Sequence, residues 1–415
     1  MFESDSHHNC AKRKYPWFRE NIHKSNSYAP GWRFTAKRPK FELYQENVSL
    51  DIDTKRAVLE SASSVVALLS YTGDQELTQC SGVIIENDAT NGHIVLTSAR
   101  LIRRPTQQNF EENFNFEDDP DENALENHLA NNLKVMIYMY DGGSYEGHVC
   151  AYDFHYNIAW IRFESNSSIP TVRLRLVDDY INVNPDEEKS VYLRPHSTHF
   201  KLVPGGAIVG VGRYFCKPFD LMAAPGEFIM KRRVNEFGCN ELLVGTHLMS
   251  QCGEGGPLIN LSGEVIGLSF YDTGFTPFLP INIAQKCWEH YKRYGELRRP
   301  FLGFVATNLW AVDISHIERV ISKIPNICNG VLVEKVIEGS SFDSPGLLEN
   351  DVIVQCGGST VHSFMEFFEM LWDKKVGDVL QLGVVRGCEN ELIHVNMVCN
   401  EVVQNFYRWP RTGSL

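Results

Sequence analysis

The sequence predicts a mainly β fold, and three observations support this prediction. Short runs rich in β-branched residues recur along the first two thirds of the chain, with the clearest at 65–69, 81–85, 93–97 and 135–139. Turn residues such as Thr72-Gly73-Asp74 separate these runs. A glycine-rich turn at 252–258 leads into another strand-like run at 265–268. Short strands at this spacing are typical of an all-β barrel or sandwich.

Length and composition set broad limits. A chain of 415 residues is too long for one ordinary core, so two or three domains are expected. A net charge of −13 argues against a general nucleic-acid binder. No apolar run is long enough to span a membrane, and the acidic start of the chain does not resemble a secretory signal. The eleven cysteines lack paired or zinc-type spacing. We therefore expect reduced thiols, a cytoplasmic or nuclear location, and no metal or cofactor.

Two strongly charged segments stand out. Residues 1–40 carry nine Lys or Arg against three acids and are interleaved with aromatics. This pattern favours an N-terminal arm, 1–55, that docks on a neighbouring domain or subunit. Its basic clusters are also compatible with a nuclear localisation signal. Residues 111–126 carry eight acids and no Lys or Arg, inside a predicted insert at 104–132. A disordered surface loop and a docking site for a basic partner both remain open for this insert.

The glycine-rich turn reads Cys252-Gly253-Glu254-Gly255-Gly256-Pro257-Leu258. It resembles the nucleophile loop of trypsin-fold serine proteases, with Glu254 at the place of the serine. The run Leu96-Thr97-Ser98-Ala99-Arg100 resembles the family's Leu-Thr-(Ala/Ser)-Ala-His, with Arg100 at the place of the histidine. In the segment before Ile158, Asn157 stands where Do-like members have the aspartate that orients this histidine.

The C-terminal part resembles a PDZ domain. Phe301-Leu302-Gly303-Phe304 is similar to the carboxylate-binding loop, and 344–353 is similar to the segment Ala-Gly-Leu-x-x-Gly-Asp-Val-Ile. Asn350 stands where that segment usually has glycine, and asparagine tolerates the left-handed conformation that such a turn needs. A one-sided apolar pattern predicts a helix, and it consists of Phe364, Phe367, Phe368, Leu371 and Trp372.

These pieces occur in the family's order over roughly residues 60–398, and they identify the chain as a Do-like (HtrA-type) homologue. The fold class is therefore expected to be mainly β: a trypsin-like double β-barrel followed by a PDZ domain, which is a β-rich α+β unit. The predicted domains are the arm 1–55, the double barrel 56–295, the PDZ domain 298–400 and a tail 401–415.

The three replaced positions predict that the protease chemistry is lost. Arg100 cannot act as a base, because a guanidinium stays protonated. Glu254 is a poor nucleophile towards an amide, and Asn157 has no histidine to orient. Cys252 replaces a glycine whose N–H helps to form the family's oxyanion hole. We expect Arg100 and Glu254 to form an ion pair, with Asn157 in hydrogen-bond reach of one of them.

Other nucleophiles or bases lie in the matching loops. A different catalytic pair, formed by two of the residues Cys252, Ser250, His247 and His155, remains an alternative. A structural role is favoured for the cysteine and for both histidines.

The predicted function is that of a catalytically degenerate homologue that binds peptide or protein C-termini. Phe301, Leu302, Gly303 and Phe304 are the predicted peptide-binding residues, because the backbone N–H groups of such a loop hold a terminal carboxylate. The resemblance implies a homo-oligomer, often a trimer. The alternatives are an active serine-type endopeptidase in protein quality control, and a scaffold whose partner sites are the acidic insert and the basic arm.

Overall fold

The computed structural model describes residue 47 and residues 49–88, 92–104, 129–183, 194–229, 239–272, 275–337, 346–387 and 391–402. Residues 1–46 of the predicted arm 1–55, the acidic run at 111–126 and residues 403–415 of the predicted tail 401–415 lie outside these residues. Within these ranges, no helix is both long enough and apolar enough to cross a membrane.

A six-stranded closed barrel forms the N-terminal half of the fold, with strand order β1-β2-β3-β6-β5-β4. Its strands are β1 (Val65–Thr72), β2 (Gln75–Asp88), β3 (Gly92–Ser98), β4 (Leu133–Tyr138), β5 (Ser144–Asp153) and β6 (Ile158–Phe163). The β-branched runs of the sequence supply its interior, where Val83 and Trp160 are fully buried. Helix α3 (Ile52–Ser61) precedes the barrel, and its N-cap Asp51 accepts from the Thr54 N–H at 2.9 Å.

A second closed barrel follows, with strand order β10-β11-β14-β13-β12-β9. Its strands are β9 (Ala207–Arg213), β10 (Leu221–Ile229), β11 (Leu243–Gly245), β12 (Pro257–Ile259), β13 (Val265–Ser269) and β14 (Thr276–Pro280). A short parallel pair, β7 (Val177–Asp178) with β8 (Phe200–Lys201), lies between the two barrels in sequence. Short 3-10 turns complete this half of the chain: η3 (Ala62–Ser64), η4 (Ala99–Ile102) and η7 (Gln251–Gly253).

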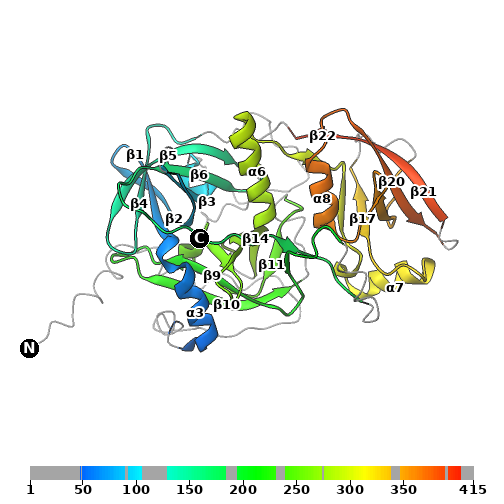
Figure 1. Cartoon of the computed structure of the whole chain (residues 1–415), viewed down its shortest axis with the longest axis horizontal. Coiled ribbons are helices and arrows are strands. Elements are labelled where there is room, and N and C mark those ends of the chain that lie inside the picture. The colour runs from blue at the N-terminus through cyan, green and yellow to red at the C-terminus, as the bar shows by residue number, and fades with distance from the viewer. Residues whose placement is uncertain are drawn as a thin grey trace, which may run out of the picture.

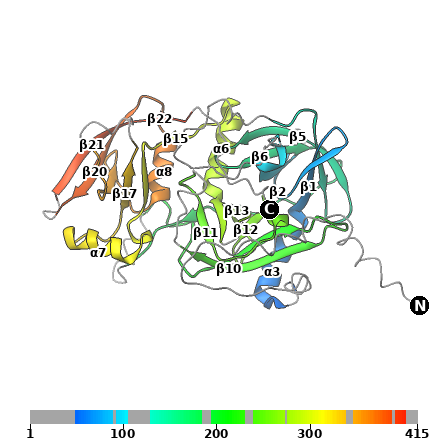
Figure 2. The same cartoon turned by 180° about the vertical axis from the view of Figure 1, so that it is seen from behind.

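Helix α6 (Ile281–Tyr294) runs directly out of β14 and ends at Gly295, whose φ of 77° is left-handed. Trp288 of this helix stacks on Trp160 of the first barrel, with ring centroids 5.6 Å apart. The helix therefore packs against the first barrel and leads the chain towards the last domain, as Figures 1 and 2 show.

The C-terminal domain is a sheet with strand order β16-β17-β18-β20-β21, with β19 paired to β18. Its elements are β15 (Pro300–Phe301), β16 (Phe304–Asn308), η8 (Leu309–Ala311), α7 (Ile314–Lys323), β17 (Val331–Val336), β18 (Val352–Cys356), β19 (Ser359–Thr360), α8 (Phe364–Trp372), β20 (Val379–Arg386), β21 (Glu391–Val398) and β22 (Asn400–Glu401). The apolar face predicted for α8 is buried, and Ser363 caps the helix by accepting from the Glu366 N–H at 3.3 Å. Asn350 adopts a φ of 71°, as its turn requires. The predicted fold class is confirmed.

Candidate functional site

The three replaced positions meet where the two barrels join. Arg100 lies in η4 directly after β3, and Asn157 directly precedes β6, so both come from the first barrel. Glu254 follows η7 and precedes β12 in the second barrel. The fold therefore brings together residues that are far apart in the sequence.

The carboxylate of Glu254 is buried at this junction, with the residue 4% exposed. Its Oε1 accepts from Ser98 Oγ at 2.7 Å and from Asn157 Nδ2 at 3.1 Å. Its Oε2 accepts from the backbone N–H of Tyr271 at 2.5 Å. Three neutral donors therefore satisfy the carboxylate, which is the condition under which a buried acid is tolerated.

The prediction of an ion pair between Arg100 and Glu254 is wrong. Across the described residues, the guanidinium of Arg100 has no carboxylate oxygen within 4.0 Å. The backbone of Arg100 is used instead, because its N–H donates to Asn157 Oδ1 at 3.1 Å. The other half of the expectation is confirmed, since Asn157 does donate to Glu254. Neutral donors already satisfy the acid, so the arginine is not needed there.

Asn157 holds this arrangement in place through an unusual backbone conformation. Its φ is 54°, in the left-handed region that asparagine tolerates better than most residues. Its backbone oxygen accepts from the Ala99 N–H at 3.1 Å, and the side chain is fully buried. Asn157 therefore links the end of β3 to the carboxylate of Glu254.

The backbone around Glu254 is folded into a tight 3-10 turn. The Gly253 N–H donates to Ser250 O at 2.9 Å, and the Glu254 N–H donates to Gln251 O at 3.2 Å. In a trypsin-fold enzyme, the N–H of the residue at the nucleophile position points at the oxyanion. Here that N–H is already used inside the turn, so the loop does not present an oxyanion hole.

Glycine is required directly after Glu254. Gly255 has a φ of 76°, and a Cβ on it would lie 2.5 Å from the backbone nitrogen of Ser98. The close approach of the two barrels at this point leaves no room for a side chain. This explains why the glycines of the family loop persist although its serine does not.

Cys252 packs beside the methionines Met222 and Met249 in a small apolar cluster. Burial raises the pKa of its thiol to about 11, although hydrogen bonds from Ser250 and from the backbone of Phe215 oppose the rise. A thiol that stays protonated at neutral pH is a poor nucleophile. This geometry fits the expectation of a small core residue.

His247 is fully buried in the second barrel, where its Nε2 lies 3.2 Å from Ser269 Oγ. Burial lowers the pKa of His247 to about 3, so the ring is neutral. A Cβ on Gly245 would lie 2.4 Å from the Nδ1 of this ring, which shows how tightly the barrel encloses it. His155 lies apart from Glu254, with its Nε2 3.6 Å from Glu241 Oε2.

Sequence reasoning missed Ser98 as a member of the site. Its hydroxyl lies 2.7 Å from Glu254 Oε1 and 2.9 Å from Asn157 Oδ1, and it accepts from the Arg100 N–H at 3.2 Å. The signal was present, because Ser98 stands at the Ala-or-Ser position of the family's Leu-Thr-(Ala/Ser)-Ala pattern. The acid at position 254 adds a second acceptor for that hydroxyl beside Asn157 Oδ1.

The predicted peptide-binding loop connects β15 to β16. Gly303 has a φ of 74°, and its carbonyl accepts from the Ile337 N–H at 3.0 Å. For the N–H groups of Leu302 and Gly303, the described part of the chain supplies no acceptor. The side chains of Leu302 and Phe304 are buried in the domain core, and Phe301 is half-buried.

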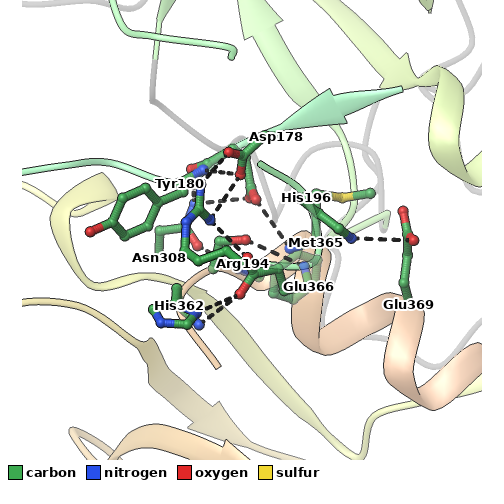
Figure 3. A network of polar contacts seen from close by, with 12 residues as sticks. Asp178, Tyr180, Arg194, His196, Asn308, His362, Met365, Glu366 and Glu369 are labelled. Carbon is green, nitrogen blue, oxygen red and sulfur yellow. Dashed lines mark hydrogen bonds and ion pairs between the residues drawn. The ribbon is translucent and has the colours of Figure 1, made fainter. Parts of the chain in front are cut away.

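A buried polar network joins the segment between the two barrels to this C-terminal domain (Figure 3). Arg194 bonds the carboxylate of Asp178, and its Nη1 lies 2.7 Å from Glu366 Oε1 at the start of α8. The Arg194 guanidinium also lies 3.9 Å from the centre of the Tyr180 ring. His196 Nε2 lies 3.3 Å from Glu369 Oε2.

Asp179 contributes a second set of contacts in the same place. Asn308, at the end of β16, donates its side-chain amide to the backbone oxygen and to the carboxylate of Asp179, at 2.9 Å each. The Met365 N–H donates to Asp179 Oδ1 at 3.2 Å. A segment of the barrel half thus lies between the end of β16 and the start of α8.

Comparisons with known proteins agree with this architecture. The family of trypsin-like peptidase domains matches residues 80–268, and the PDZ domain family matches residues 300–397. The chain is 28% identical over 270 residues to the Do-like 14 protein of Arabidopsis thaliana, covering 61% of this chain and 54% of that protein. It is 25% identical over 281 residues to serine protease HTRA4 of Mus musculus, covering 64% and 52%.

The chain thus spans about half the length of the curated relatives it matches. Among solved structures, the HtrA-type protease AlgW with a tripeptide matches with a TM-score of 0.51 at 14% identity. That match covers 85% of this chain and 98% of the AlgW chain, and it concerns the fold alone.

Proposed function

Because this chain belongs to the Do-like (HtrA-type) family of trypsin-fold serine proteases with a C-terminal PDZ domain, we propose that it binds peptide C-termini without hydrolysing peptide bonds. The observation that carries this proposal is the buried carboxylate of Glu254. It occupies the nucleophile position and is held by Ser98, Asn157 and the Tyr271 N–H.

The absence of hydrolysis follows from what this position offers. Acyl transfer needs a hydroxyl or thiol nucleophile, a base and an oxyanion hole. Glu254 supplies no hydroxyl, and Arg100 supplies no base. The Glu254 N–H is committed to Gln251 O, so the charge on a tetrahedral intermediate would meet no preorganised donor. Each of these losses lowers turnover by itself, and here they occur together.

Binding rests on the loop between β15 and β16. The N–H groups of Leu302 and Gly303 suit a terminal carboxylate, which accepts such bonds strongly. Strand β16 lies at one end of its sheet, so a ligand can add to it as a further strand. The apolar side chain of Phe301 beside the loop favours a hydrophobic last residue.

The contacts of Asp179 limit the length of the ligand. A peptide whose terminal carboxylate lies at Gly303 and whose chain runs along β16 approaches Asn308. The side-chain amide of Asn308 is already hydrogen-bonded to Asp179. The same carboxylate accepts from the Met365 N–H at the start of α8. We expect the last few residues of a ligand to bind, and longer segments to require withdrawal of the barrel segment.

The test of hydrolysis exposes the purified chain to unfolded casein and to a fluorophosphonate probe, with an intact serine protease of this family as positive control. We expect neither cleavage nor labelling. Labelling of the wild-type chain would support the alternative, an active serine-type endopeptidase in protein quality control. The site of labelling, read by mass spectrometry, would then name the nucleophile.

The test of binding uses fluorescent peptides that end in a hydrophobic residue, with the same peptides amidated as control. The free carboxylates should bind and the amides should not. Gly303→Ala should weaken binding by about tenfold or more, because alanine at a φ of 74° displaces the loop N–H groups. Gly377→Ala is the matched control, since Gly377 has a φ of 89° in open space. Equal loss in both variants would contradict the assignment of the loop.

The remaining expectations concern the acidic insert and the oligomeric state. Deletion of 111–126 should leave peptide binding unchanged. If the deletion instead abolishes the binding of a protein partner, the scaffold alternative is favoured. A homo-oligomer is expected from the family, and light scattering of the full chain tests it.

A further inference from the structure

A histidine, a cysteine and a glutamate converge at a place away from Glu254. His155 lies in the turn between β5 and β6, and Cys239 and Glu241 lie just before β11. One potential ligand atom of each residue lies within 4.8 Å of the other two. His155 Nε2 is 3.6 Å from Glu241 Oε2, and Cys239 Sγ is 3.4 Å from the same oxygen.

These separations match the edges of a tetrahedral zinc site. Zinc binds nitrogen and oxygen at about 2.0–2.2 Å and sulfur at about 2.3 Å, so neighbouring ligand atoms lie about 3.3–3.6 Å apart. Two of the interatomic distances in the cluster agree with such edges: the distance from His155 Nε2 to Glu241 Oε2 and the distance from Cys239 Sγ to the same oxygen. Imidazole, thiolate and carboxylate are also the three ligand types that zinc takes most often.

Burial sets this cluster apart from a casual surface group. Cys239 is 1% exposed and Glu241 is 7% exposed, while the side chain of His155 is 23% exposed. A buried carboxylate is stabilised by a compensating charge, and a bound cation supplies one. The partly open side at His155 gives an ion a path of entry and leaves room for a water ligand.

The neighbouring acid is already engaged and does not compete for an ion. Asp153 Oδ1 accepts from the Tyr156 N–H at 2.9 Å, and Asp153 Oδ2 lies 3.1 Å from Arg299 Nε. Its charge is therefore balanced by the arginine. The side chains that face the Glu241 carboxylate are His155 and the thiol of Cys239, and both are zinc ligands in their deprotonated forms.

We propose that His155, Cys239 and Glu241 bind one Zn²⁺ ion, with water as the fourth ligand. Binding displaces the thiol proton of Cys239 to solvent, so the site joins Zn²⁺ to one thiolate, one carboxylate and one neutral imidazole. The ion ties the turn before β6 to the segment before β11, and thus the first barrel to the second. Because Asn157 follows His155 by two positions in that turn, the ion also positions the donor to Glu254.

The experiment measures zinc directly on the full chain. The chelator-treated protein is titrated with Zn²⁺ against a chromophoric chelator, and Co²⁺ replaces zinc for absorption spectroscopy. We expect about one equivalent of zinc per chain and a raised melting temperature. Co²⁺ should show thiolate-to-metal charge transfer and tetrahedral absorption bands.

The variants make the test specific. Cys239→Ser and Glu241→Gln should each weaken zinc binding by about tenfold or more, and Cys239→Ser should remove the charge-transfer band. Cys150→Ser, which changes a half-buried thiol on β5, is the control and should bind as wild type. Far-ultraviolet circular dichroism shows whether each variant is folded. Absence of stoichiometric binding by the wild type, or equal binding by Cys239→Ser and Cys150→Ser, would overturn the proposal.

Discussion

The side-chain amide of Asn157 donates to the carboxylate of Glu254 across 3.1 Å, between two barrels that contribute one residue each. Both side chains are buried. By the resemblance to the family's motifs, the contact joins the positions of the triad aspartate and serine, which here carry an amide and a carboxylate. The stability of this junction is therefore open to mutational tests.

Glu254→Gln should destabilise the fold although it preserves the shape of the side chain. The glutamine amide cannot accept from Ser98, Asn157 and the Tyr271 N–H at once, because its NH₂ group only donates hydrogen bonds. The buried donor left without an acceptor costs about 1–3 kcal/mol of unfolding free energy. Urea unfolding checks this. If Ser98→Ala and Glu254→Gln prove strictly additive, the two side chains do not interact.

Arg100→Met should change the free energy of unfolding by less than about 0.5 kcal/mol, because the guanidinium lies within 4.0 Å of no carboxylate oxygen among the described residues, and substitutions that remove no such contact usually have effects of this size. The contacts of Arg100 within the site come from its backbone N–H, which the substitution keeps. Urea unfolding beside Glu254→Gln gives the comparison. A loss as large as that of Glu254→Gln would show that the guanidinium is coupled to the carboxylate after all.

Restoring the triad should not restore the enzyme. In the triple variant Arg100→His, Asn157→Asp and Glu254→Ser, Cys252 still replaces glycine and the N–H of residue 254 still lies in a turn. Casein hydrolysis should stay far below that of an intact relative. Adding Cys252→Gly should raise the rate more than any single reversion does. Full activity of the triple variant would show that the turn rearranges freely.

Arg194→Met should loosen the contact between the segment that links the two barrels and the PDZ domain. The change leaves the buried carboxylate of Asp178 without its cation and leaves Glu366 with His362 alone, and breaking a buried pair typically costs about 3–5 kcal/mol. Urea unfolding measures this cost, and limited proteolysis should cut the junction sooner. Lys286→Ala, which removes a partly exposed pair with Asp373, is the control and should cost less than about 1 kcal/mol.

The contact of His196 with Glu369 should make stability fall at alkaline pH. Burial lowers the pKa of His196, but the hydrogen bond and charge of Glu369 outweigh it, so the pKa lies above its ordinary value of 6.5. A raised pKa in the folded state stabilises fully below 6.5, and the gain is lost as pH rises through the folded pKa.

The matched variant His196→Gln isolates this effect. Its deficit in unfolding free energy relative to wild type should be larger at about pH 6 than at about pH 9. Nearby His199, whose pKa is lowered by burial and by His196, titrates in the opposite sense; burial acts on it in both proteins, while the effect of His196 is lost in the variant. A deficit that is independent of pH would show that His196 acts through packing alone.

Single elements could be predicted from local patterns, as the strand at 93–97 and the apolar face of α8 show. The double barrel with a PDZ domain was predicted from the resemblance of several motifs, in their order, to the Do-like family. The replacement of all three triad positions is likewise a statement about residue identity. The proposal that the family's nucleophile and base are absent rests on the identities of Glu254 and Arg100, and the hydrolysis experiment tests it.

Only the tertiary structure decided which group satisfies Glu254. Complementary charge favoured Arg100, but hydrogen bonding is directional, and the barrels aim Ser98 Oγ, Asn157 Nδ2 and the Tyr271 N–H at the two carboxylate oxygens. The convergence of His155 with Cys239 and Glu241 was invisible for a related reason. These residues lie far apart in the sequence and approach each other only because the two barrels pack together. No local sequence motif could therefore have shown that they form one cluster.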